Sequence, residues 1–451
     1  MRRMSCPHPT RDNGFVSQFE SLFGCSRETF EAMQDPRRGP QPKLPAWNLL
    51  ASLIYHVLGG AGHFSAHVYQ LFGLEIKDSS LSGRRQRMGL EPFAWLMGHA
   101  LRPLADRGTH PSCFYKGLRL CGIDGSRWSV TNTPQILERM GKAAARRLKA
   151  AFAKVEMCTL VELGLHNPIG AVVGLDGEGE WSLAKQLLSS LPEGSLLVVD
   201  RLYGCGEYLK ELRAACASAK SELLVRARGN IRSHKAERLP DGSSIVSINI
   251  RSQKGGHHVK GEVRVREIRG RIKKPGGKAW SEVRLWTTLL DEEAYPAQEL
   301  LELYAERWEH ELFYKELKLH MRGGEVLHSH TPETAAQEVA ALLMACSIIA
   351  RERGEAARSG RLQPLSISFL KTLDKMSSLW AVFEVSDGLL DDGARGLMVA
   401  RVRELIVREA IPERRQRSCP RKVRQPVRGW PRLTKNESSE GGFVVEVVNF
   451  P

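Results

Sequence analysis

Residues 116–228 constrain the fold more than any other part of the chain, because strand and helix patterns succeed one another there. Three strand candidates come first, and short apolar runs then alternate with helical segments. The strand candidates are LRLCGIDGSRWSV, VEMCTLVELGL, PIGAVVGL, SLLVVD and ELLVRAR, and the helical segments are WSLAKQLLSSL and GEYLKELRAACASA. Adjacent strands followed by strand–helix alternation predict a mixed α/β sheet.

Residues 1–115 show helical patterns. AWNLLASLIYHVLGG has apolar residues at helical spacing and ends on two glycines. SSLSGRRQRMGLEPFAWLMGHALRPL has the pattern of a turn followed by a basic helix and an apolar helix. This region is either a DNA-contacting helical module or a helical cap packed on the next domain.

Residues 229–292 alternate between polar and apolar positions, with Gly and Pro between the runs, which predicts a small β insertion with basic faces. The α/β domain is then expected to resume as a second part at 293–350. Its first helix should run from Pro296 to about His320. A further apolar helix should follow, with Thr331 as its N-cap and Pro332 at its first position.

Residues 351–451 are expected to contain a helical segment, GLMVARVRELIVREA, and a basic tail. The tail sequence ERRQRSCPRKVRQPVRGWPRLTK carries nine Lys or Arg, one Glu and three prolines, so it cannot build a core. It is either a DNA-gripping arm or a solubilising extension.

The whole chain is basic, with 66 Lys and Arg against 51 Asp and Glu, a formal net charge of +15 and a pI near 9.5. This excess favours a polyanionic partner, with nucleic acid ahead of a membrane. The nine cysteines are scattered, with no Cys-x-x-Cys pair, which suits a reducing cytosol. The most apolar stretches, at 44–58 and 340–350, are too short or interrupted to span a bilayer, so we expect a soluble intracellular protein.

Two aspartates occupy positions where a sheet would present functional groups. Asp124 lies in the first strand candidate, and Asp200 ends the SLLVVD run before the next helix. Ligands and catalytic groups collect at such strand ends in α/β sheets. Either residue taken alone could be structural, since Asp124-Gly125 is also a turn signal and Asp200 could cap the following helix.

The segment LYAERWEHELFYKELKLH is densely charged but carries aromatic residues throughout. At about 100° per residue, one continuous helix would place five side chains within an arc of about 80°. They are Tyr304, Arg307, Glu311, Lys315 and Lys318. An adjoining apolar stripe would comprise Leu301, Trp308, Leu312 and Leu319, with Glu302, Glu306, Glu309 and Glu316 on the far side.

A single carboxylate in a basic row has two interpretations. Glu311 and Lys315 could form a routine i,i+4 ion pair worth about 0.3–0.5 kcal/mol. The row also suits a site where a metal ion meets phosphates. Phosphodiester cleavage with two divalent ions uses three carboxylates as oxygen ligands, while neighbouring Arg and Lys hold the phosphates.

The spacing Y-x2-R-x3-E-x6-K, formed by Tyr304, Arg307, Glu311 and Lys318, resembles the signature of the insertion-sequence-four family of DDE transposases. IDGSRWSVTNTP resembles the family's first aspartate motif, LLVVDRLYG its second, and LHSHTPETAAQEVAALLMACSII the segment after the signature. The resemblance covers roughly residues 40–350. The stretch AFAKVEMCTLVELG lacks the Pro and Arg common at this place in the family.

The resemblance implies a ribonuclease-H-like catalytic domain with a β insertion between the second Asp and the Glu. It implies Mg²⁺, for which Mn²⁺ may substitute, bound by Asp124, Asp200 and Glu311. The implied DNA contacts are Tyr304, Arg307, Lys315, Lys318 and Arg226. Family members can stack a flipped base on a Trp of the insertion, here Trp286 or Trp280, although either Trp could instead be packed within the β insertion.

The implied function is cut-and-paste transposition. A homodimer would bind terminal inverted repeats, cleave the transposon ends and join them to target DNA in the bacterial cytoplasm, in association with the nucleoid. Two alternatives stay open: a Mg²⁺-dependent endonuclease on the same fold, and an inactive derivative that only binds DNA. Cleavage without joining would indicate the first, and binding without metal-dependent cleavage the second.

Overall fold

The computed structural model describes most of the chain. The described residues are 14–24, 27–32, 42–59, 62–142, 150–251, 258–273, 280–305, 307–321, 326–386 and 389–411. All of them except Lys273 and Trp280 belong to one compact unit. The basic tail at 413–435 lies outside the described residues.

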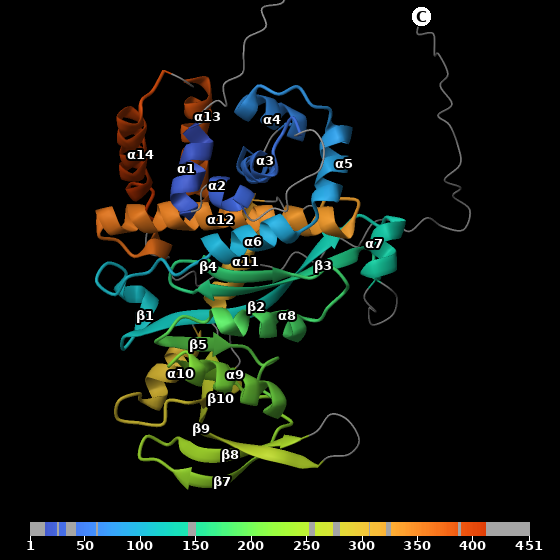
Figure 1. Ribbon diagram of the computed structural model, residues 1–451. Helices are drawn as coiled ribbons and strands as arrows, with labels where there is room; N and C mark the ends of the chain where they lie inside the picture. Colours follow the sequence, from blue (N-terminus) through green and yellow to red (C-terminus); the bar gives the residue numbers. More distant parts are fainter. Residues whose placement is uncertain are drawn as a thin grey trace, which may run out of the picture. The chain divides into compact units, whose positions relative to one another are not determined.

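A mixed sheet of ten strands, counted over the described ranges, forms the centre of this unit (Figure 1). Its order is β4-β3-β2-β5-β6-β10-β9-β8-β7, with the short β1 paired to β2. The strands are β1 (Phe114–Tyr115), β2 (Leu118–Val130), β3 (Ala153–Glu162), β4 (Asn167–Val173), β5 (Ser195–Val199), β6 (Glu222–Arg226), β7 (Ser233–Arg238), β8 (Ser244–Arg251), β9 (Val259–Lys273) and β10 (Trp280–Thr287).

The first five long strands have ribonuclease-H-like topology. β2, β3 and β4 form an antiparallel meander, and β5 and β6 then add in parallel on the other side of β2. All five strand patterns expected between 116 and 228 are present. The fold class expected from the sequence is therefore confirmed.

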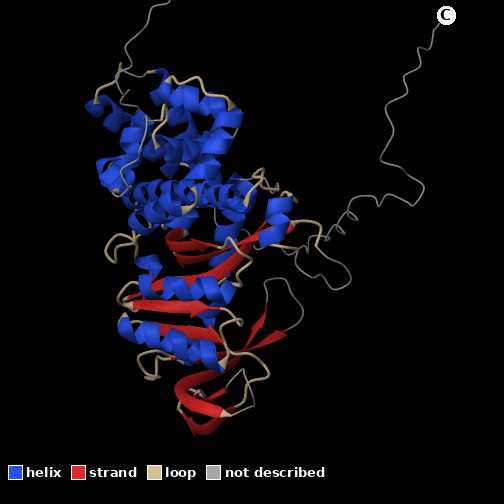
Figure 2. Ribbon diagram, turned by 45° about the vertical axis from the view of Figure 1, so that its right-hand side comes forward, coloured by secondary structure: helices blue, strands red, loops and turns tan. Residues whose placement is uncertain are grey.

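Helices cover both faces of the sheet (Figure 2). Successive side chains of a strand point to opposite faces, so alternate apolar residues pack against the helices on each face. One face packs on α8 (Glu180–Leu187) and α9 (Gly206–Ser218) through a core that includes Ile123, Val199 and Val225. The other face packs on α10 (Ala297–Ala305) through a core that includes Leu120, Val198 and Leu224.

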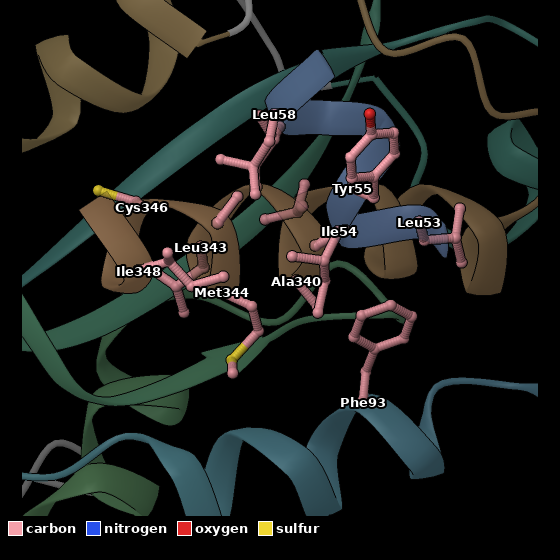
Figure 3. Close-up of a cluster of buried hydrophobic side chains, with 14 of the residues drawn as sticks. Leu53, Ile54, Tyr55, Leu58, Phe93, Ala340, Leu343, Met344, Cys346 and Ile348 are labelled. Atoms are coloured by element: carbon pink, nitrogen blue, oxygen red, sulfur yellow. The ribbon is translucent and has the colours of Figure 1, made fainter. Parts of the chain in front are cut away.

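A layer of helices packs beyond the β4 edge. They are α1 (Gly14–Phe23), α2 (Arg27–Ala32), α3 (Ala46–Gly59), α4 (Phe64–Phe72), α5 (Asp78–Met88), α6 (Glu91–Ala100), α12 (Pro332–Gly360), α13 (Phe369–Val385) and α14 (Asp392–Val407). The 29-residue α12 contacts α3, α6, α13 and α14 as well as β3 and β4. Figure 3 shows its core, where Ile54 and Leu58 of α3 and Phe93 of α6 meet Ala340 and Met344 of α12.

The start of α12 is fixed as its sequence predicts. Thr331 and Thr334 form a reciprocal capping box, and Pro332 is the first helical residue. Arg85 of the basic helix α5 donates to the side chain of Gln337 at 3.3 Å and to the carbonyl of Thr334 at 3.0 Å. This part of the basic helix therefore packs on α12, as expected of the helical cap.

Within the described residues, α12 is long and apolar enough to cross a membrane by length and mean hydropathy, which differs from the expectation that this region is too short or interrupted. Its apolar window is 89% buried within the fold. This window is apolar because the rest of the protein packs around it.

Strands β7 to β10 lie within the β insertion expected at 229–292, and β10 pairs with β6, so the insertion continues the central sheet. Three other sequence expectations need correction. Two strands of the sheet were not expected from the sequence. They are the short β7 at the edge of the sheet and β1, which pairs with β2. Helix α13 lies in 351–451, where only the helical segment GLMVARVRELIVREA and the basic tail were expected from the sequence.

The third correction concerns the charged helix expected from Pro296 to His320. Residue 307 is a turn between α10 and α11 (Trp308–Lys315), and a π-helical segment, η3 (Glu316–Met321), follows. Both features shift the angular phase from that of one continuous α-helix. As a result Leu319 is exposed, whereas Phe313, Tyr314 and Leu317 are buried. The remaining short helical segments are η1 (Pro111–Cys113), α7 (Pro134–Arg139), η2 (Leu188–Ser190) and η4 (Pro364–Ser366).

Candidate active site

The strand register places Asp124 beside Asp200. In the sheet, Ile123 of β2 pairs with Val199 of β5, and Val199 pairs with Val225 of β6. The residues that directly follow Ile123, Val199 and Val225 are Asp124, Asp200 and Arg226. Because Ile123, Val199 and Val225 face α8 and α9, alternation turns this next row toward α10 and α11.

Asp124 is partly buried in a strongly anionic environment. Its Oδ1 accepts a hydrogen bond from the Gly125 N–H at 2.9 Å. Burial, followed by the negative charges of Glu180 and Asp200, raises the pKa of Asp124 to about 7. Asp200 Oδ1 accepts a bond from the Leu202 N–H at 2.5 Å. The charge of Asp200 therefore contributes to the raised pKa of Asp124.

Helix α11 is fastened to the strand that carries Asp124. The Tyr314 hydroxyl contacts the backbone carbonyl oxygen of Asp124 at 2.6 Å and the Thr159 hydroxyl at 2.8 Å. His310 also contacts Thr159, at 3.2 Å, and burial lowers the pKa of His310 to about 3. The helix comes this close because residue 122 is glycine: a Cβ there would lie 2.8 Å from His310 Nδ1.

Glu311 lies one turn before Tyr314 and is about two-fifths exposed. Its Oε1 accepts a hydrogen bond from Arg307 Nη2 at 3.0 Å. Burial would lower the pKa of Arg307, but Tyr304, Glu311 and Asp124 together raise it. Arg307 therefore links Glu311 electrostatically to Asp124.

Tyr304 and Lys318 border the same region. Burial raises the pKa of Tyr304 to about 12. The charge of Asp200 also raises this pKa, whereas the charges of Arg307 and Arg226 lower it. Lys318 donates to the Arg127 carbonyl at 3.0 Å and lies 5.4 Å from the centre of the Trp128 ring. Burial and then Lys154 lower its pKa, while Asp124 raises it. Lys315 is exposed on α11.

Comparison with known proteins identifies the family. A model of the family described as "Transposase DDE domain" matches residues 116–348, just over half of the chain. The chain belongs to the DDE transposase family. It is 26% identical over 371 residues to the Escherichia coli transposase InsG for insertion sequence element IS4, covering 81% of this chain and 80% of that protein. The insertion-sequence-four resemblance is thereby confirmed.

Two further matches are more limited. The putative transposase InsZ of Escherichia coli is 28% identical over 128 residues, which is 28% of this chain and 42% of that protein. A cryo-EM structure of a piggyBac transposase synaptic complex with hairpin DNA aligns with 89% of this chain and 84% of its own. Its TM-score is 0.44 at 10% identity, so the fold assignment rests on the strand order instead.

The donor chemistry of the DDE transposase domain fits a divalent metal ion. Carboxylate oxygens are the ligands that Mg²⁺ prefers. A bound cation would also offset the negative charges of Glu180 and Asp200, which raise the pKa of Asp124. Asp124, Asp200 and Glu311 do not form a metal-ligand cluster in this structure, since no three His, Cys, Asp or Glu residues in the described ranges are grouped to hold an ion. Glu311 is instead turned to Arg307.

An arginine-lined groove adjoins Asp200 in this transposase fold. A cavity of about 440 Å³ is lined by Asp200, Arg201 and Arg228. It shares Arg201 with a cavity of about 660 Å³, and Arg228 with one of about 740 Å³. The arginines lining the three cavities are Arg201, Arg226, Arg228, Arg232, Arg269, Arg271 and Arg284. Only Arg226 among them was expected from the sequence, although several stand in the short runs DRLYG and VRARGNIR.

Trp286 is packed within the fold in this structure, and the base-stacking role expected for it stays a prediction. Its side chain is fully buried against the α8 and α9 core, and its Nε1–H donates to Glu267 at 3.0 Å. The alternative, a Trp packed within the fold, is the one observed. The side chain of Trp280 lies outside the described residues.

Two glutamates expected on the outer side of the charged helix instead point inward. His166 contacts Glu309 at 3.0 Å through Nε2 and Glu316 at 2.8 Å through Nδ1. Arg353 of α12 binds Glu316 at 2.9 Å. Burial would raise the pKa of Glu316, but Arg353 and His166 outweigh it and lower the value to about 2. The helix break reorients this face, so the cluster anchors α11 to the β3–β4 turn.

Proposed function

We propose that this protein is a cut-and-paste DNA transposase that cleaves transposon ends and joins their 3′-hydroxyls to target DNA. The observation that carries the proposal is the strand register, which places Asp124 and Asp200 one residue beyond the paired Ile123 and Val199, with the helix of Glu311 bonded to the backbone of Asp124. Membership of the DDE transposase family supports the same chemistry.

Asp124, Asp200 and Glu311 are proposed to hold Mg²⁺, or Mn²⁺ in its place. The bound metal would activate the attacking water or hydroxyl and stabilise the leaving oxygen of the phosphodiester. Glu311 is now bonded to Arg307, so metal binding would draw Glu311 away from that partner. Arg307 would then be available for a DNA phosphate, which it can grip through paired hydrogen bonds.

Further phosphate contacts are proposed around this centre. Arg226 continues the row of the two aspartates, and the arginine-lined groove extends from Asp200. The charge of Asp124 raises the pKa of Lys318, and Lys315 is exposed on α11. Tyr304 is buried, so its proposed role is to support Arg307 and limit water around the reacting phosphate.

The substrate is proposed to be the terminal inverted repeats of a transposon, with double-stranded target DNA as acceptor. Two ends must be held together before joining, so a homodimer is proposed as the active form. The proposed location is the bacterial cytoplasm, in association with the nucleoid, because that is where such DNA is found.

The test is a strand-transfer assay with DNA that carries the transposon end, in the presence of Mg²⁺. We expect nicking at the end and joined products from the wild-type protein, and neither from Asp124→Asn, Asp200→Asn or Glu311→Gln. Glu302→Gln, an exposed site on α10, is the matched control and should retain activity. Cleavage without joining would favour an endonuclease, and DNA binding without cleavage an inactive derivative.

A further inference from the structure

Two loops next to the second aspartate have their backbones in direct contact. We call residues 200–204 the aspartate turn and residues 227–231, which follow β6, the β6 loop. The Arg228 N–H donates to the Gly204 carbonyl at 3.0 Å. A Cβ at residue 204 would lie 1.9 Å from the Arg226 carbonyl oxygen, so only glycine allows this approach. The two loops therefore cannot shift independently.

The side chain of Arg228 joins the two loops a second time. Its Nη2 donates to the Leu202 carbonyl at 2.5 Å and its Nε donates to the Arg201 carbonyl at 3.2 Å. The Leu202 N–H in turn donates to Asp200 Oδ1 at 2.5 Å. Arg228 thus holds the residue whose backbone orients the carboxylate of Asp200.

Arg284 of β10 fixes the β6 loop in place. Its Nη2 donates to the carbonyls of Arg228 at 2.5 Å and Ile231 at 2.6 Å. Its guanidinium carbon lies 5.4 Å from the centre of the Trp286 ring, and its Nε is 3.9 Å from Glu267. Because Trp286 and Glu267 are both buried, Arg284 connects the β6 loop to a rigid part of the β insertion.

Four arginines that line the groove next to Asp200 divide into two pairs. Arg228 and Arg284 donate to backbone carbonyls, which leaves them fewer donors for a phosphate. The guanidinium groups of Arg201 and Arg226 make no hydrogen bond within the part of the chain that the structure describes. Only the second pair therefore has its full set of donors open to the groove.

We propose that Arg284 and Arg228 are positioning residues, which fix the carboxylate of Asp200 for the reaction and do not contact DNA phosphates. The inference rests on the proposed function, because it assigns further residues to the same site. Since Arg284 lies on β10, the β insertion itself sets the position of the second aspartate. Such a role matters because misplacing a reacting group by about 1 Å can reduce a rate about a hundredfold.

The first test needs neither metal nor cleavage. Hydrogen–deuterium exchange in EDTA compares the wild-type protein with Arg284→Ala. The amides of residues 202–205, which are bonded within or next to the aspartate turn, should exchange about tenfold faster in the variant, because the charge-assisted bonds that hold the β6 loop are lost. Exchange in β4 should stay at the wild-type rate, whereas general destabilisation would accelerate it as well.

The matched control for this test is Arg238→Ala, which removes an exposed arginine of the β insertion that does not line the groove. It should leave exchange at residues 202–205 unchanged. Wild-type exchange there in Arg284→Ala would overturn the proposal, and so would equal acceleration at residues 202–205 and in β4.

The second test separates positioning from phosphate contact. Single-turnover cleavage of end-containing DNA with Mg²⁺, at saturating protein, should be about tenfold to a hundredfold slower in Arg284→Ala and in Arg228→Ala. The slope of log DNA affinity against log salt should stay at the wild-type value in Arg284→Ala, whereas Arg226→Ala should reduce it by about 1. A reduced slope with wild-type cleavage in Arg284→Ala would make Arg284 a phosphate ligand and overturn the proposal.

A further variant covers a failure of Arg284→Ala to fold. Arg284→Lys keeps the charge and the apolar stem beside Trp286, but its ammonium group lacks the planar fork that bonds two carbonyls. It should show faster exchange at residues 202–205 with an unchanged salt slope, and wild-type exchange there counts against the inference. Absence of end-specific cleavage by the wild-type protein overturns the proposed function. Wild-type cleavage with unchanged exchange in both Arg284 variants overturns the inference alone.

Discussion

The hydroxyl of Tyr314 contacts the backbone carbonyl oxygen of Asp124 at 2.6 Å. This contact joins the helix that carries Glu311 to the strand that carries the first aspartate. It does not depend on a metal ion, so the protein itself sets the approach of the two elements. The second contact of the same hydroxyl, with Thr159, fixes the tyrosine to the neighbouring strand.

Tyr314→Phe should therefore reduce both stability and DNA cleavage. A buried hydroxyl with two partners is lost while the ring is retained, and the partners are left unsatisfied at a cost of about 1–3 kcal/mol. Urea unfolding measures the first effect and single-turnover cleavage the second. Tyr69→Phe is the matched control, because Tyr69 is 54% exposed on α4. A variant that cleaves at the wild-type rate would show that this contact does not position Glu311.

Asp124→Asn should stabilise the metal-free protein at neutral pH. The pKa of Asp124 is raised from 3.8 to about 7, so the folded state binds more protons than the unfolded state between these values. Stability from this group is greatest below about pH 4 and falls as pH rises to about 7, by at most about 4 kcal/mol. Unfolding in EDTA at pH 5 and pH 7.5 measures the loss, which should shrink in the variant. An unchanged difference between the two pH values would contradict the assignment.

His166→Gln should destabilise the protein most in acid. Burial would lower the pKa of His166, but Glu316 and Glu309 raise it above its ordinary 6.5. Its stabilising effect is thus fully present below pH 6.5 and is lost as pH rises through the folded pKa. The expected cost at pH 6 is about 3 kcal/mol, because two buried or half-buried carboxylates lose their partner.

The His166→Gln difference from wild type should diminish above the folded pKa. Denaturant unfolding across pH 6 to 9 follows it. Replacing His234, which is 3.9 Å from Glu262 in a half-exposed pair, supplies the control and should have little effect. A cost that stays constant over this range would mean that His166 is neutral when folded.

Arg226→Ala should weaken DNA binding in a way that depends on salt. Removing one phosphate contact is expected to reduce the slope of log affinity against log salt by about 1. Fluorescence anisotropy at several salt concentrations measures this slope. Arg213→Ala on α9 is the control, because Arg213 is exposed and is not among the residues lining the groove. Equal slopes for both variants would place DNA elsewhere.

The strands and helices of the central domain follow closely from local pattern. The run SLLVVD is apolar because β5 is buried on both faces. Thr331 and Pro332 start α12 because the threonine hydroxyl accepts a backbone N–H of the first turn, and proline has no N–H that needs a partner there. Two of the proposed acidic residues were also visible from the sequence, since Asp124 lies within a strand pattern and Asp200 directly follows one. The expected helical periodicity failed at 307–321, where a turn at residue 307 and a π-helical segment change the angular phase.

The sequence by itself therefore determined the elements, the family and the residues to examine, because hydrophobic period and residue spacing are local properties. Only the tertiary structure decided which groups meet. It set Asp124 against Asp200 through strand register, turned Glu309 and Glu316 inward to His166, buried Trp286 and brought Glu180 over Gly125. These contacts join residues far apart in the chain, and they depend on packing and charge that no local pattern records.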